Sequence, residues 1–76
     1  MINNIIFIEI DDIYGIRTII NVESILMLRE NISLCPRDSR FDKCNEIVCK
    51  GNTHIYTNEP IPNIIDRMKD AVDQAN

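Results

Sequence analysis

The first two thirds of the chain carry short apolar runs with the two-residue period of β-strands. Residues 5–10, IIFIEI, form a run too short and too rich in β-branched side chains for a helix. Residues 25–34 alternate apolar with polar side chains, as in a strand with one buried face. The apolar positions of that alternation are Leu26, Leu28, Ile32 and Leu34. The pattern breaks at Glu30, so we expect a hairpin or a β-bulge at Glu30 and Asn31.

Turn-forming residues separate these runs. Gly15 ends the sequence DDIYG and can adopt positive φ, and Asn21 before VES is a capping signal that predicts one helical turn. Gly51 and Asn52 predict a two-residue hairpin loop. That loop would pair Lys50 with Thr53, Cys49 with His54 and Val48 with Ile55, so that the side chains of Cys49 and His54 face each other.

The last part of the chain has the helical period. Glu59 and Ile61 precede prolines and favour extended backbone, so the helix should begin with Pro62 in its first turn. One apolar stripe follows at three- and four-residue steps, formed by Ile61, Ile64, Ile65, Met68, Ala71, Val72 and Ala75.

Together these patterns predict a single α+β domain over residues 1–76. Its core would be a small antiparallel sheet or a partly closed barrel of four to five strands, with one C-terminal α-helix. The predicted strands are about 5–10, 16–20, 25–34, 45–50 and 53–57, and the predicted helix is about 62–75.

The second face of the predicted sheet is more apolar than a solvent-facing surface should be. Ile5, Phe7, Ile19 and Met27 would lie there. A domain of 76 residues has little core to stabilise it. We therefore expect a second copy of the chain to cover this face or a sheet edge, unless barrel closure within one chain covers it.

Composition narrows the class of protein. The formal net charge of −4 argues against a general nucleic-acid binder, which needs a basic face. The N-terminus lacks the basic region of a signal peptide, and no apolar run approaches twenty residues. We expect a cytoplasmic protein with no membrane partner, and the abundance of isoleucine and asparagine suggests a low-GC bacterium or a phage-infected host.

Three cysteines and the only histidine lie within residues 35–54. Eight residues separate Cys35 from Cys44, four separate Cys44 from Cys49, and four separate Cys49 from His54. This spacing resembles that of CCCH zinc fingers and supplies a tetrahedral zinc ligand set. The alternative is that the cysteines are small buried apolar groups, with no cofactor.

Cys49 and His54 could also form a nucleophile and a base. No third orienting residue, oxyanion-hole motif or glycine-rich loop accompanies the pair, and so short a chain leaves little room for an enclosed site. The expectation is that the protein is not an enzyme.

Acidic residues gather on one face of the predicted helix. Asp66, Asp70 and Asp73 fall at i, i+4 and i+7, opposite the apolar stripe. This face could imitate the phosphates of DNA or dock on a basic partner, as an inhibitor of a host defence enzyme would, or it could be an ordinary solvated surface.

The order of strands, turns and helix looks like that of the small FlbD family of flagellar-operon proteins. The matching positions are Asn21, Glu23 and Ile25, then Lys50, Gly51 and Asn52, then Glu59, Ile64 and Ile65. Pro60 stands where that family usually has a serine, and the loop from Pro36 to Lys43 is longer. The resemblance implies an accessory or regulatory binding module and transfers no active-site residues.

The sequence therefore predicts a small non-enzymatic accessory protein that acts through protein–protein interaction and forms a homo-oligomer. The candidate partner-binding residues are Asp66, Asp70, Asp73, Phe7, Ile19 and Met27. Two alternatives stay open at this point. One is a zinc-stabilised module that uses Cys35, Cys44, Cys49 and His54, and the other is an oligomer that captures a small ligand such as a nucleotide between subunits.

Overall fold

The computed structural model describes residues 5–33 and 43–75. In chain order the elements are β1 (Phe7–Asp11), β2 (Arg17–Asn21), the 3-10 turn η1 (Val22–Ser24), β3 (Ile25–Ile32), β4 (Cys44–Cys49), β5 (Thr53–Thr57) and α1 (Ile61–Ala75). These elements confirm the predicted small α+β fold. The bounds of each differ from the prediction by two residues at most, and Leu34, the predicted end of the third strand, lies outside the described residues.

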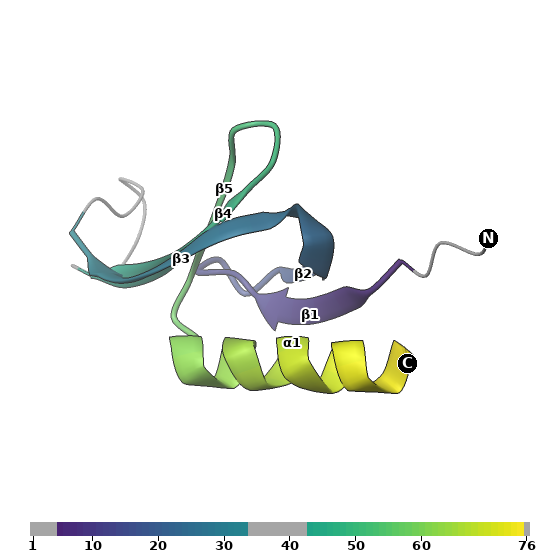
Figure 1. Cartoon of the computed structure of the whole chain (residues 1–76). Helices are drawn as coiled ribbons and strands as arrows, with labels where there is room; N and C mark the ends of the chain where they lie inside the picture. Colours follow the sequence, from purple (N-terminus) through teal and green to yellow (C-terminus); the bar gives the residue numbers. More distant parts are fainter. Residues whose placement is uncertain (1–4, 34–42, 76) are drawn as a thin grey trace.

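The described strands form two antiparallel sheets and no closed barrel. β1 pairs with β2 in one sheet, and the other sheet has the order β3-β4-β5. Helix α1 runs alongside β1, while the loop between β4 and β5 projects from the side away from the helix (Figure 1).

Local sequence signals explain where the elements begin and turn. Gly15 has φ 78° in the turn between β1 and β2. The side chain of Asn21 accepts the backbone N–H of Glu23, which confirms the predicted cap of η1. Asn31 has φ 53° at an irregularity between Arg29 and Ile32, where the sequence predicted a hairpin or bulge.

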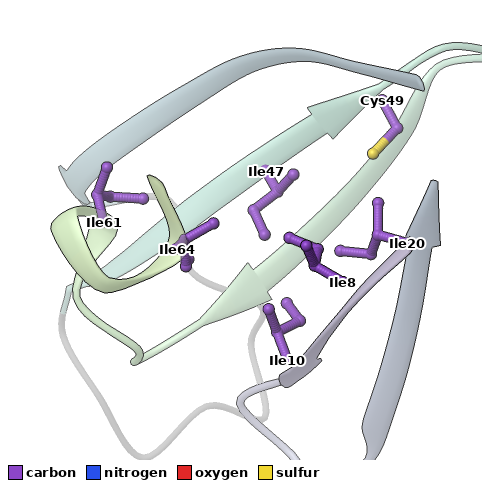
Figure 2. Close-up of a cluster of buried hydrophobic side chains, with 7 residues drawn as sticks. All are labelled: Ile8, Ile10, Ile20, Ile47, Cys49, Ile61 and Ile64. Carbon is purple, nitrogen blue, oxygen red and sulfur yellow. The ribbon is translucent and has the colours of Figure 1, made fainter. Parts of the chain in front are cut away.

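The core brings together side chains from both sheets and the helix. Its buried members are Ile8, Ile10, Ile20, Ile47, Cys49, Ile61 and Ile64. Figure 2 shows these side chains converging between the strands and the start of α1. Each buried isoleucine contributes about 1.5–3 kcal/mol relative to an exposed one, so this cluster is the main favourable term in folding.

Helix α1 has Pro62 in its first turn, as predicted, but it begins one residue earlier, at Ile61, which the sequence placed in extended backbone. Ile61 and Ile64 are buried in the core, and Met68 and Ala71 pack against it. The apolar stripe of the helix extends beyond the part that packs on the core, since Ile65 and Val72 are each 37% exposed.

No helix in the described part of the chain combines the length and the apolar character needed to cross a bilayer.

Candidate functional site

The hairpin that carries Cys49 and His54 has a different register from the one predicted. Cys49 pairs with Thr53, and His54 pairs with Val48. The loop therefore has three residues, Lys50 to Asn52, and the predicted pairing of Cys49 with His54 is wrong. Because neighbouring side chains alternate between the two faces of a sheet, this shift of one residue places Cys49 and His54 on opposite faces.

The register of β4 and β5 also determines the face of the sheet on which each cysteine of β4 lies. Cys49 is 5% exposed and belongs to the core, whereas Cys44 is 3% exposed and lies outside the core cluster. Strand alternation puts Cys44 on the face that carries His54. Cys35 lies outside the described residues, and no group of three potential metal ligands occurs within the described ranges. The zinc hypothesis thus loses the face-to-face placement of Cys49 and His54 that the predicted hairpin register gave it.

A carboxylate takes the place of the thiol beside His54. Glu46 is 3% exposed, although it lies on the outer face of the three-stranded sheet. Its Oε1 atom accepts a hydrogen bond from Arg29 at 3.2 Å, and its Oε2 atom lies 2.9 Å from Nδ1 of His54. Arg29 faces Glu46 across β3 and β4, while His54 reaches it diagonally from β5.

These partners determine the charge state of Glu46. Burial raises the pKa of the carboxyl group, but the hydrogen bond to His54, the charges of His54 and Arg29, and a hydrogen bond to Tyr56 outweigh burial, so the pKa lies below its ordinary value. Glu46 is therefore an ionised, paired carboxylate. Together with Arg29, His54 and Tyr56 it holds the three strands of this sheet together.

A second polar cluster covers the free edge of β1. Thr57 donates to the carbonyl of Asp11 at 2.6 Å, and Oε2 of Glu59 accepts the Asp11 N–H at 2.8 Å. Arg67 of α1 pairs with Glu59 and donates to the carbonyl of Glu9 at 2.9 Å. The hydrogen bond from Arg67 lowers the pKa of Glu59 against the opposing effect of burial, and Arg67 in turn has a raised pKa. Side chains thus occupy the positions where another strand would bind.

The opposite edge of the same hairpin, along β2, is paired with no further strand in the described part of the chain, where β1 is the only strand that is hydrogen-bonded to β2. Ile8 and Ile10 use their backbone groups to pair with Ile20 and Thr18, so Arg17 and Ile19 direct theirs to the outer edge. This edge is the kind of surface that recruits another strand.

The predicted apolar face is divided between the two sheets. Phe7 and Ile19 are 52% and 60% exposed and lie on the outer face of the β1–β2 hairpin. Ile5, which precedes β1, is 63% exposed. Met27 is 52% exposed but belongs to the other sheet, where it pairs with Val48. The single second face that the sequence predicted is therefore wrong, although all four side chains are exposed.

The acidic helix face is exposed at Asp66, Asp70 and Asp73. Asp73 also borders a groove of about 440 Å³ between α1 and η1, in which Val22, Met68 and Val72 form apolar walls. Asp73 is therefore not fully opposite the apolar stripe of the helix.

The sequence analysis missed Glu46, Arg29, Thr57 and Glu59 as residues of polar sites. One signal was present, because Glu46 is the only charged residue of the run CNEIVC, in which four of the six residues are cysteine, isoleucine or valine. A charged side chain within so apolar a strand indicates a paired partner across the sheet.

The chain was compared with known proteins in three ways. No family model, no curated protein and no solved structure matched it. The resemblance to the FlbD family therefore stays a prediction from the residues quoted for it.

Proposed function

We propose that this chain is a small non-enzymatic binding protein that acts through protein–protein contact and associates with a second copy of itself through the outer edge of β2. The observation that carries the proposal is the contrast between the two edges of the β1–β2 hairpin. Side chains of Thr57, Glu59 and Arg67 cover the β1 edge, whereas no described strand pairs with the outer edge of β2, which carries Ile19 at 60% exposure.

The β2 edge is compatible with pairing to itself. Ile19 is the central residue of the five-residue strand Arg17–Asn21. A two-fold axis through Ile19 would place Ile19 opposite the same residue of the second copy, and Arg17 opposite Asn21. No like charges would then face each other, and the two hairpins would form one sheet in which the Phe7 and Ile19 side chains of both copies make a continuous apolar stripe.

The absence of a catalytic step is part of the proposal. Its support is the separation of Cys49 from His54 on opposite faces of the sheet, which removes the thiol and imidazole pair. His54 instead contacts Glu46 and Asn52, and Arg29 holds the other carboxylate oxygen of Glu46. A role as an inhibitor of a host defence enzyme would use the exposed acidic face of α1, and it remains a prediction.

Sedimentation velocity at rising protein concentration tests the proposal. We expect a reversible dimer. Ile19→Lys should shift it to monomer, because an ammonium group at the centre of the pairing would oppose its own copy. Ile16→Lys is the matched control, since Ile16 is 61% exposed but precedes the strand; this variant should dimerise as the unmodified chain does.

Circular dichroism would establish that both variants are folded. A strictly monomeric chain at all concentrations would overturn the proposal, and so would a dimer that Ile19→Lys leaves intact.

A further inference from the structure

A small notch lies at the edge of β5 that is not paired with β4, where the turn between β1 and β2 meets the strand. It has a volume of about 240 Å³, and its lining includes Asp12, Tyr14, Thr18, His54 and Tyr56. Pockets for drug-sized ligands usually measure about 300–1,000 Å³, so the notch suits a single side chain better than a cofactor.

Backbone hydrogen bonds fix the walls of the notch. Ile13 donates its N–H to the carbonyl of Tyr56 at 2.9 Å, which attaches the turn to β5. Asp12 Oδ1 accepts the N–H groups of Tyr14 and Ile16, both at 2.9 Å, and Gly15 adopts φ 78°. The turn that carries Tyr14 is therefore held against the strand before any ligand arrives.

The chemistry of the lining favours a planar cation. Three aromatic residues, Tyr14, Tyr56 and His54, line the notch. Asp12 also lines it, and the turn uses the Oδ1 atom of its carboxylate but not Oδ2. The edge of the His54 ring is engaged, because Nδ1 lies 2.9 Å from Glu46 and Nε2 lies 3.2 Å from Asn52.

We propose that this notch receives the guanidinium group of an arginine side chain presented by a binding partner. Guanidinium is planar, stacks on aromatic rings and binds carboxylates through parallel hydrogen bonds. An anion would meet the carboxylate of Asp12, and the net charge of −4 attracts basic partners. The notch borders β2 through Thr18, but the proposal rests on the chemistry of its lining and not on dimerisation through β2.

The chain contains its own reporter of this notch. It has no tryptophan and only two tyrosines, and both tyrosines line the notch. Intrinsic fluorescence and the ring signals of tyrosine in NMR spectra therefore come from Tyr14 and Tyr56 alone.

The test is a titration with N-acetyl-arginine amide at constant ionic strength, followed by tyrosine fluorescence and by backbone amide shifts. We expect saturable binding in the millimolar range, typical of one side chain, with shifts at Tyr14 and His54. The citrulline counterpart has the same shape without the charge and should not bind, and the lysine counterpart should bind more weakly.

Asp12→Asn removes the charge but keeps an oxygen that can accept both turn hydrogen bonds, so the turn is preserved. It should weaken binding by about fivefold. Asp11→Asn is the matched control, because it removes a neighbouring charge from outside the notch, and it should leave binding nearly unchanged. Absence of saturable binding, equal binding of citrulline or lysine, or equal effects of the two variants would overturn the proposal.

Discussion

The hydroxyl group of Thr57 offers a sharp test of how the two sheets and the helix are held together. Thr57 is 0% exposed, donates to the carbonyl of Asp11 at 2.6 Å and accepts the N–H of Glu59 at 3.1 Å. Thr57→Val has nearly the same shape but no hydroxyl, and leaves both backbone groups without this partner. An unpaired buried polar group costs about 1–3 kcal/mol. Because Asp11 is exposed and can regain water, we expect a total loss of about 2–3 kcal/mol.

Thr57→Ser is the matched variant, since it keeps the hydroxyl and loses only a buried methyl group, at a cost of about 1 kcal/mol. Urea unfolding followed by circular dichroism, at one fixed protein concentration, compares the two. With a slope of about 1 kcal/mol per M for so small a domain, the midpoint should fall by about 2–3 M for Thr57→Val and about 1 M for Thr57→Ser. If the valine variant proves as stable as the serine variant, the reasoning is refuted, and burial of the methyl group matters more than the hydrogen bonds.

Two further predictions concern acid stability and the first turn. The pKa of Glu46 is lowered from 4.5 in the folded protein, so its pairing stabilises the fold above pH 4.5, and this stabilisation is lost as the pH falls through the folded pKa. Glu46→Gln should therefore lower the free energy of unfolding at neutral pH and flatten its decline in acid. An unchanged dependence of the unfolding free energy on pH would contradict this. Gly15→Ala should cost about 1 kcal/mol in the same urea assay, because φ is 78° there and alanine disfavours positive φ. An added Cβ atom would meet nothing within 4 Å, so no steric clash increases this cost. A loss near zero would mean that the turn relaxes.

The two clusters on the sheets have different consequences for binding. Thr57, Glu59 and Arg67 protect the β1 edge with side chains that are themselves satisfied. Native proteins usually protect the edges of their sheets. An outer edge of β2 that no described strand covers is therefore the candidate binding surface of this hairpin. The buried carboxylate of Glu46 serves the fold, since its hydrogen bonds and ion pairs join β3, β4 and β5.

Part of the candidate site was visible in the sequence. Phe7 and Ile19 were identified as apolar residues on an outward face, and both are exposed on the outer face of one hairpin. Met27 was assigned to the same face because the sequence does not show that five strands separate into two sheets. Alternation also placed Leu26 on the buried face, but Leu26 is 62% exposed. The reason is that the register of β3 shifts between Ile25 and Met27, which leaves Leu26 without a partner position in β4.

Local chemistry determined the order and the ends of the elements. Pro62 fits the first turn of a helix, Gly15 permits positive φ, and Asn21 caps the turn that follows it; each of these preferences acts within a few residues. The sequence alone therefore predicted four to five strands, a capped turn and one terminal helix, with ranges close to the observed bounds.

Only the tertiary structure decided which residues meet. A hairpin loop of three residues in place of two moved His54 away from Cys49 and brought it to Glu46. Contacts such as Thr57 with Asp11 and Arg67 with Glu9 join residues 46 and 58 positions apart. No local preference encodes such contacts, because they depend on the register of every strand between the two residues and on the packing of the helix against the first strand.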